Sequence, residues 1–299
     1  MPKKLNEQAR NTLRLSDVNS DYLEKQNGIH HIVAKASDKG QVRKKNEDSI
    51  GTLEYTQVFG SVSYPVGIYL LCDGLGGYEA GEIASSLAVS SITQKLMLSL
   101  FTNGASVFNE STPHDSNQNL FEQAVFEANE TICRRAKTMK NEMAATLTGA
   151  LITGQIASVI NIGDSRTYLF NKENGLQLIT QDHSLVFRFF LTGDIKFDDI
   201  YKHPQRNQIL RSLGENGLKE SLQEMANRLN HPYFYQFTME RGDTILLCSD
   251  GLWQEVRDNE IEKILFSQTN PNDACKKLIS TANMKGGEDN ISAILVKIE

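Results

Sequence analysis

Residues 69–74 read YLLCDG, a short apolar run that ends in an aspartate and a glycine. Residues 245–251 read ILLCSDG and repeat this order much later in the chain. Apolar runs of this length are typical of buried strands. A carboxylate at the mouth of a buried strand is costly unless it is hydrogen-bonded, paired or bound to a cation. The two runs therefore predict buried strands that each deliver an acidic side chain needing a partner.

Other acidic residues lie in similar settings. Asp164 follows the apolar run at 159–163, Asp289 comes shortly before the last apolar stretch, and Glu47 and Asp48 stand at the head of another predicted strand. Several carboxylates with no His or Cys among them form the ligand set of a hard cation, Mg²⁺ or Mn²⁺. Each aspartate taken alone is better explained as the start of a turn, but the whole set favours a metal site.

The order of the predicted elements favours an α+β fold with antiparallel sheets, because short turns join several strands and strict βαβ alternation is missing. Residues 1–27 show no sustained period and are interpreted as an N-terminal arm, whereas 28–299 form a single predicted domain with a flap-like insertion at about 184–232. The predicted strands cover 32–36, 48–55, 66–72, 145–153, 156–162, 166–170, 176–180, 233–238, 244–248 and 291–298. The predicted helices cover 79–101, 120–139, 259–266 and 272–284, with a polar loop at 103–117.

Composition narrows the class of protein. The chain has 299 residues with a formal net charge of −6, so a basic surface for nucleic acid is not expected. Its four cysteines are not clustered, which indicates neither a disulfide framework nor a zinc site. No apolar region follows the basic residues 1–4, and no stretch of bilayer-spanning length is expected. These features predict a cytoplasmic protein without a membrane partner.

Glycines follow Asp73 and Asp250, and those after Asp73 allow a second interpretation as a phosphate-binding loop. Gly74 and Gly251 let the backbone turn sharply and bring a carbonyl close to a ligand, and GLGG at 74–77 lies between a predicted strand and a predicted helix. Position 79 is Glu, however, so the dinucleotide-binding fingerprint fails, and no Gly-Lys-Ser/Thr phosphate loop occurs. A Rossmann or P-loop fold is therefore not favoured.

Six blocks of this sequence resemble, in the same order, the motifs of the metal-dependent protein phosphatase family (the protein phosphatase 2C type), in its bacterial form. The blocks are SDKGQVRKKNED (37–48), CDGLGG with GEIAS (72–77 and 81–85), GDSR (163–166), TQDHS (180–184), SDGL (249–252) and EDNI (288–291). Single blocks are weakly specific, but six in order are highly specific. The resemblance runs from Ala34 to Lys297.

The resemblance implies two central antiparallel sheets flanked by helix pairs, and two catalytic Mg²⁺ or Mn²⁺ ions bridged by an activated water. It implies that Asp73 bridges both ions and that Arg43 holds the substrate phosphate. The implied metal-binding residues are Glu47, Asp73, Gly74 through its carbonyl, Asp250 and Asp289, with Asp164 assigned to a third, weaker ion. Leu75 departs from eukaryotic relatives, which carry at this position a His proposed as general acid.

The implied function is hydrolysis of phosphoserine and phosphothreonine in proteins by a metal-activated water. The expected partners are phosphoproteins modified by a Ser/Thr kinase, and the expected state is a monomer. Two alternatives remain open from the sequence: a catalytically weak module that binds phosphoproteins, and a phosphatase for a small phosphorylated metabolite. The implied metal-binding acids are all present, which argues against the catalytically weak module. Only a substrate assay distinguishes a metabolite phosphatase from a protein phosphatase.

Overall fold

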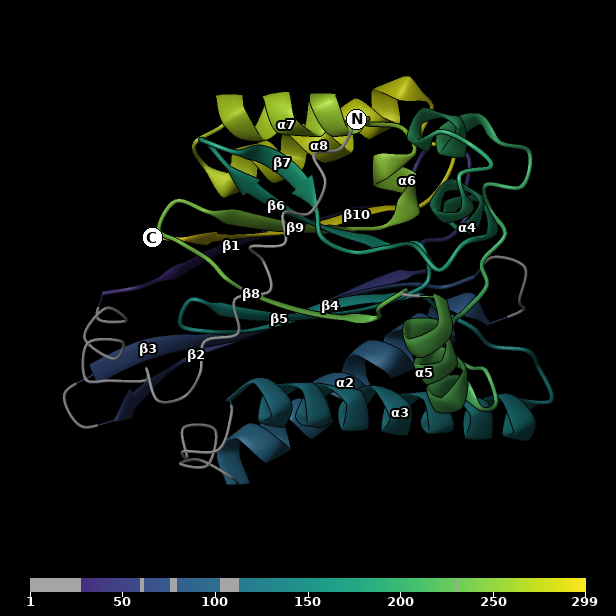
Figure 1. Ribbon diagram of the computed structural model, residues 1–299, viewed down its shortest axis with the longest axis horizontal. Coiled ribbons are helices and arrows are strands. Elements are labelled where there is room, and N and C mark those ends of the chain that lie inside the picture. The colour runs from purple at the N-terminus through teal and green to yellow at the C-terminus, as the bar shows by residue number, and fades with distance from the viewer. Residues whose placement is uncertain (1–27, 60–61, 76–79, 103–112, 230) are drawn as a thin grey trace.

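The computed structural model describes residues 28–59, 62–75, 80–102, 113–229 and 231–299. Two five-stranded antiparallel sheets lie face to face, and helices cover their outer faces (Figure 1). This confirms the predicted α+β arrangement. The N-terminal arm predicted at 1–27 lies outside the described residues, and the domain division stays a prediction.

Sheet A holds both ends of the described chain. Its strand order is β1-β10-β9-β6-β7. The strands span His31–Asp38 (β1), Ile291–Ile298 (β10), Thr244–Cys248 (β9), Arg166–Asn171 (β6) and Gly175–Leu178 (β7). Strand β1 pairs with β10 along its whole length, from His31 opposite Ile298 to Asp38 opposite Ile291. The last strand in sequence therefore lies inside the sheet, between the first strand and β9.

Sheet B has the order β2-β3-β4-β5-β8. Its strands span Asp48–Phe59 (β2), Val62–Asp73 (β3), Leu147–Thr153 (β4), Ile156–Ile162 (β5) and Phe234–Thr238 (β8). On β3, Tyr69 and Leu71 face the core between the two sheets, whereas Leu70 and Cys72 pack under the helices. Because both faces of this strand are buried, it reads as a continuous apolar run rather than an alternating one.

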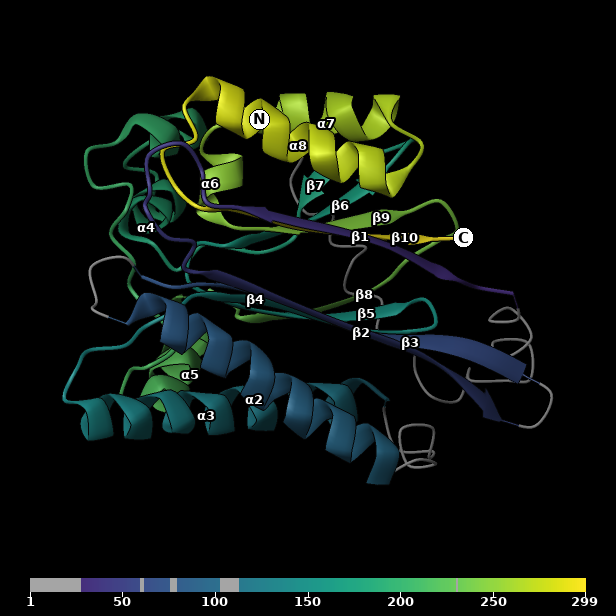
Figure 2. The same cartoon turned by 180° about the vertical axis from the view of Figure 1, so that it is seen from behind.

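Two pairs of helices cover the sheets (Figure 2). Helices α2 (Gly81–Thr102) and α3 (Pro113–Met139) cover sheet B, and α7 (Asp258–Ser267) and α8 (Pro271–Lys285) cover sheet A. The prediction of a loop over 103–117 was wrong for 113–117, because α3 begins at Pro113, a residue that the first helical turn tolerates. Residues 103–112 lie outside the described residues.

Helix α2 corrects one expectation. Its residues Gly81–Phe101 are long and apolar enough, by length and composition alone, to cross a membrane. Its buried side chains recur at helical spacing and pack against sheet B and α3, as in the core helix of a folded domain. They are Ala84, Ala88, Ile92, Leu96 and Leu100.

The segment predicted as an insertion mixes short helices and loops. It contains α4 (Leu185–Thr192), the 3₁₀ helix η4 (Phe197–Lys202) and α5 (Leu218–Leu229). Helix α4 starts where the Ser184 side chain accepts a hydrogen bond from the backbone N–H of Phe187 and ends at Gly193, whose φ is 82°. An isolated bridge between Leu213 and Ala145 joins the segment to the rest of the domain, and another joins Ser184 to Ile209 within the segment.

Candidate active site

The acidic residues that the sequence placed at separate strand ends meet at one end of the sandwich. Asp48 begins β2 and lies directly opposite Asp73, the last residue of β3. Asp250 follows β9 and opens the short helix α6 (Asp250–Trp253), which was not predicted. Asp289 comes just before β10, and Asp164 lies between β5 and β6. Both sheets therefore contribute carboxylates to one cluster.

Asp73 lies at the centre of this cluster. Its side chain contacts those of Asp48 and Asp250. Burial, and then the negative charge of Asp48, raise the pKa of Asp73 well above its usual range. Burial also raises the pKa of Asp48 to about 6, and burial together with the nearby Asp289 raises the pKa of Asp250 to about 7. Such mutual repulsion is relieved when a cation binds between the groups.

Glu47 and Asp164 are charged neighbours of the other acids in the cluster. Burial, and then the charge of Glu82, raise the pKa of Glu47. Burial and the charge of Asp250 raise the pKa of Asp164 well above its usual range. The backbone carbonyl of Asp164 accepts a hydrogen bond of 2.9 Å from Nε1 of Trp253, which fixes its loop against α6.

Asn290 holds the loop that carries Arg43 and Glu47. Its side-chain oxygen accepts a hydrogen bond of 2.8 Å from the backbone N–H of Glu47, and its side-chain nitrogen donates to the carbonyls of Lys39 and Lys45. Reasoning from sequence assigned no role to this residue, although its place directly after Asp289 was a usable signal. Asp48 was counted among the acids at strand ends but left out of the ligand set that the resemblance implies, and its side chain accepts a hydrogen bond from Ser249 Oγ at 2.9 Å within the cluster.

The two glycines after the site aspartates lie where backbone segments approach each other closely. Neither Gly74 nor Gly251 has a positive φ. A Cβ on Gly74 would lie 2.3 Å from the carbonyl oxygen of Gly81, and one on Gly251 would lie 2.2 Å from that of Asn290. Glycine is needed here because two backbone segments approach closely, not because the chain turns into a left-handed conformation.

Arg43 reaches the cluster from the opposite loop. Its guanidinium donates a hydrogen bond of 2.7 Å to Asp289 Oδ2, and the side chain remains 41% exposed. This hydrogen bond, partly offset by burial, raises the pKa of Arg43. Only one of the five N–H donors of a guanidinium is used in this contact. Arg43 thus places a positive charge beside the acids at an accessible edge of the site.

The acid cluster fits a hard divalent cation. Asp48 Oδ1 and Asp250 Oδ1 are buried and have no hydrogen-bond partner, and an unpaired buried carboxylate oxygen is costly. In the described part of the chain, no three His, Cys, Asp or Glu side chains already form a group that could hold a metal ion. Asp73 instead contacts two other acids, and Asp289 contacts Arg43. The all-oxygen donor set matches Mg²⁺ or Mn²⁺ once these side chains turn toward an ion.

The raised pKa values predict how pH affects the stability of the metal-free protein. A carboxyl group whose pKa rises from 3.8 to about 6 (Asp48) or about 7 (Asp250) stabilises the folded state below pH 4. That contribution is lost as pH rises through the folded-state pKa values. In EDTA, the melting temperature of the chain is therefore expected to fall between pH 5 and about pH 7.5. The Asp250→Asn variant should show a smaller fall, whereas a rise in both proteins would contradict the assignment.

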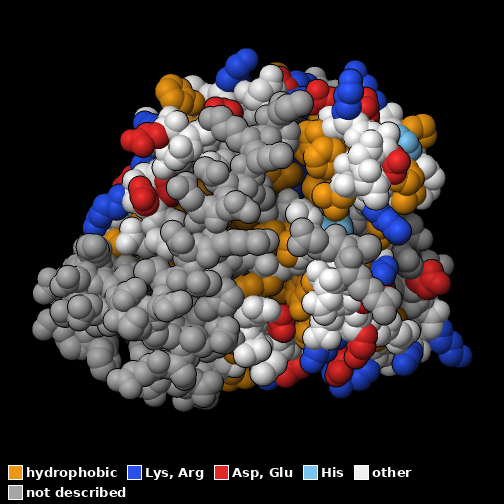
Figure 3. Space-filling view, in the orientation of Figure 1, with side chains coloured by type: hydrophobic (Ala, Val, Ile, Leu, Met, Phe, Trp, Pro, Cys, Tyr) orange, Lys and Arg blue, Asp and Glu red, His pale blue; other side chains and the backbone are white. Residues whose placement is uncertain are grey.

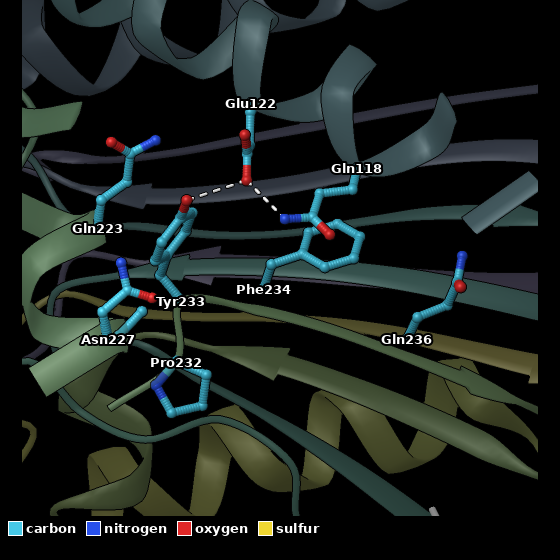
Figure 4. A pocket seen from close by; sticks show the side chains of 9 residues that line it. Gln118, Glu122, Gln223, Asn227, Pro232, Tyr233, Phe234 and Gln236 are labelled. Carbon is cyan, nitrogen blue, oxygen red and sulfur yellow. Dashed lines mark hydrogen bonds between the residues drawn. The ribbon is translucent and has the colours of Figure 1, made fainter. Parts of the chain in front are cut away.

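A cavity away from these acids is an alternative candidate for the site. It has a volume of about 450 Å³ and lies between α3, α5 and β8 (Figure 4). Its single acidic side chain, Glu122, already accepts hydrogen bonds from Gln118 and Tyr233, at 2.8 and 2.9 Å. Side-chain amides, aromatic rings, Ala226 and Pro232 line the rest, so the cavity lacks the ligand set of the acid cluster. We therefore take the acid cluster as the active site.

Comparison with known proteins agrees with this site. A family model described as "Protein phosphatase 2C" matches residues 46–295. The serine/threonine phosphatase stp of Listeria welshimeri is 33% identical over 265 residues, which are 87% of this chain and 93% of that protein. The serine/threonine protein phosphatase PstP of Mycobacterium tuberculosis is 29% identical over 269 residues, 89% of this chain and 44% of that protein.

Solved structures have the same fold. The serine/threonine phosphatase Stp1 from Staphylococcus aureus gives a TM-score of 0.74 at 28% identity, covering 90% of this chain and 96% of that one. The catalytic domain of PstP in complex with two manganese ions gives 0.68 at 27% identity, covering 90% and 99%. The range that the family model matches covers most of the sequence and includes the acids of the cluster. This match confirms the resemblance drawn from the six blocks. The chain belongs to the protein phosphatase 2C family.

Proposed function

We propose that this chain hydrolyses phosphoserine and phosphothreonine in protein substrates and that the reaction requires Mg²⁺ or Mn²⁺. The observation that carries this proposal is the cluster of buried carboxylates, drawn from both sheets, with Arg43 at its exposed edge. Its family and the activities named for its relatives support the same reaction. We further propose that the substrates are proteins modified by a Ser/Thr kinase, and that the chain acts as a cytoplasmic monomer.

The residues that would hold two ions are Glu47, Asp73, the Gly74 carbonyl, Asp250 and Asp289, with Asp164 for a third. When bound, such ions lower the pKa of water to give a nucleophile and neutralise charge on the phosphate. Asp73 supplies the central negative charge, and Thr146 holds its backbone: the Thr146 N–H donates to the Asp73 carbonyl at 2.8 Å, and the Asp73 N–H donates to Thr146 Oγ1 at 3.1 Å. Arg43 binds phosphate oxygens through its planar set of N–H donors and keeps the phosphate facing the acids.

Metal removal tests the proposed reaction. Because the site carries several carboxylates, it repels a phosphate dianion unless cations are bound. Hydrolysis of an aryl phosphate and of a phosphothreonine peptide is expected to fall to background in EDTA and to return when Mn²⁺ is added in excess. Turnover and circular dichroism are measured on the same samples, so that loss of metal is distinguished from loss of fold. Full activity in EDTA would refute the metal-dependent mechanism.

Replacing Arg43 by Ala tests phosphate recognition. A charge-assisted hydrogen bond contributes about 1.5–3 kcal/mol, so kcat/KM for a phosphopeptide is expected to fall about tenfold or more. Mn²⁺ affinity, measured by calorimetry, should change much less, because Arg43 contacts Asp289 but supplies no ligand. Arg43→Lys serves as the control that keeps the charge without the planar fork and should recover only part of the loss. An unchanged kcat/KM in Arg43→Ala would show that this side chain is merely a surface charge.

A further inference from the structure

A second cavity lies beneath the segment that carries α4. It has a volume of about 70 Å³ and is lined by Arg188 of α4, Leu210 and Arg211 of the following loop, Met225 of α5, and His231. None of these five lining residues is acidic. One water needs only about 10–15 Å³ of such space. The cavity is therefore large enough for a small polyatomic ion.

Two of its nitrogen atoms lack a partner. Arg211 Nε and His231 Nε2 are buried and make no hydrogen bond within the described residues. His231 is only 2% exposed. Buried donors and acceptors are nearly always paired, and an unpaired one calls for an unseen ligand, ion or water. Two residues that line the cavity thus carry buried polar atoms without a partner.

The charge of the cavity is positive. Arg188 is exposed at the surface of α4, and within the described residues its guanidinium forms no ion pair or hydrogen bond. On the face seen in Figure 3, Lys and Arg side chains lie at the surface between α4 and α5. Leu210 and Met225 supply apolar walls, which strengthen the attraction of an anion to the arginines by limiting water. Two guanidinium groups in such surroundings favour a tetrahedral oxyanion.

His231 narrows the choice of oxyanion. A neutral imidazole nitrogen accepts a hydrogen bond, whereas a protonated ring donates one. Phosphate near neutral pH exists both with and without an O–H group, because its second pKa lies near 6 when it is bound to a side chain. A phosphate group can therefore form a hydrogen bond with His231 Nε2 whether the imidazole is neutral or protonated. It can also accept hydrogen bonds from Arg188 and Arg211.

The cavity adjoins the active site through the backbone. The N–H of Leu210 donates to the carbonyl of His183, and the N–H of His183 donates to the carbonyl of Gly163, both at 2.7 Å. Gly163 immediately precedes Asp164. On the other side, Leu213 pairs with Ala145, which pairs with Gly74. An anion held here lies next to the segments that place two of the metal-site residues.

We propose that this cavity is a second phosphate-binding site, separate from the carboxylate cluster and without a role in the chemical step. Its ligand is either inorganic phosphate or the phosphate of a second phosphorylated side chain on the same substrate. Arg188 and Arg211 neutralise the anion, and His231 completes its hydrogen bonds. This goes beyond the proposed hydrolysis, which needs only one phosphate at the metals.

Titration calorimetry with inorganic phosphate tests the site on the full chain, in EDTA and with Mn²⁺. In EDTA, one phosphate is expected to bind, and Arg188→Gln should weaken it by about tenfold or more, in line with the loss of one charge-assisted contact. With Mn²⁺, a second site should appear that Arg43→Ala weakens and Arg188→Gln does not. Arg135→Gln, an equally exposed arginine on α3, is the matched control and should leave both sites unchanged. The measurement in EDTA needs no turnover, so its outcome does not depend on whether the proposed reaction is correct.

Peptides identify the source of the anion. Wild-type kcat/KM is compared for peptides that carry one or two phosphothreonines at several spacings. A preference for two phosphates that Arg188→Gln removes, without change in aryl phosphate turnover, assigns the site to a phosphorylated side chain. Calorimetric binding without such a preference assigns it to inorganic phosphate. If phosphate does not bind in EDTA and no preference depends on Arg188, or if Arg43→Ala alone abolishes all binding, the proposal is wrong.

Discussion

Replacing Asp73 by Asn is expected to lower Mn²⁺-dependent turnover by about a thousandfold or more, comparable with the largest losses from removing one electrostatic group in an active site. Asp73 contacts both Asp48 and Asp250, so removing its charge changes the electrostatics of the whole cluster. Asn keeps the shape of the side chain and the backbone hydrogen bonds to Thr146. The measurement is kcat with an aryl phosphate at saturating Mn²⁺.

Stability separates this loss from misfolding. Burial raises the pKa of Asp73 well above its usual range, so its ionised form destabilises the metal-free fold at neutral pH. The Asp73→Asn chain should therefore melt at the same or a higher temperature than the wild type in EDTA, and should gain less from added Mn²⁺. Asp273→Asn, an exposed aspartate in the first turn of α8, is the matched control and should keep full turnover. Turnover above a tenth of wild type in Asp73→Asn would contradict the central role of this acid.

Replacing Asp182 by Ala is expected to lower the free energy of unfolding by about 3–5 kcal/mol, because it leaves a buried cation unpaired. Arg166 and Asp182 are both fully buried and joined by two hydrogen bonds of 2.9 and 2.7 Å. The guanidinium carbon of Arg166 also lies 3.5 Å from the ring centre of Trp253. Urea denaturation of the Mn²⁺-loaded protein gives the difference directly. Total stabilities of single domains are about 5–15 kcal/mol, so this loss is a large fraction.

A double replacement shows whether the charge or the packing matters. Exchanging Arg166 for Met together with Asp182 for Leu removes both charges, and a buried ion pair replaced by apolar groups is often tolerated. The double variant is expected to be more stable than Asp182→Ala alone. A cost below about 1 kcal/mol for Asp182→Ala would mean that water or another acid compensates Arg166.

The strands were predictable because a strand that is buried on both faces consists of a continuous run of apolar residues. The predicted runs at 156–162, 244–248 and 291–298 match β5, β9 and β10 at both ends. Acids at the ends of such strands were also visible. The end of β3 carries Asp73, and the register of two antiparallel strands then brings Asp48 opposite it.

What the sequence could not supply were side-chain contacts between distant segments. Arg43 pairs with Asp289 across 246 positions, and Asn290 binds Glu47 across 243. No local period records such contacts, so Asn290 was given no role and Asp48 was left out of the ligand set. Helix α6, only four residues long, carries too few side chains to show a helical period.

Strand β10 follows every other strand in the sequence but lies between β1 and β9 in sheet A. N-terminal segments leave the ribosome first, so a growing chain contains Glu47, Asp73 and Asp250 before it contains Asp289 and β10. Until then β1 has no partner in its sheet, and the loop of Arg43 lacks the hydrogen bonds from Asn290. We therefore expect dephosphorylation to begin only after β10 has been synthesised, and a stop codon ahead of β10 to remove folding and activity together.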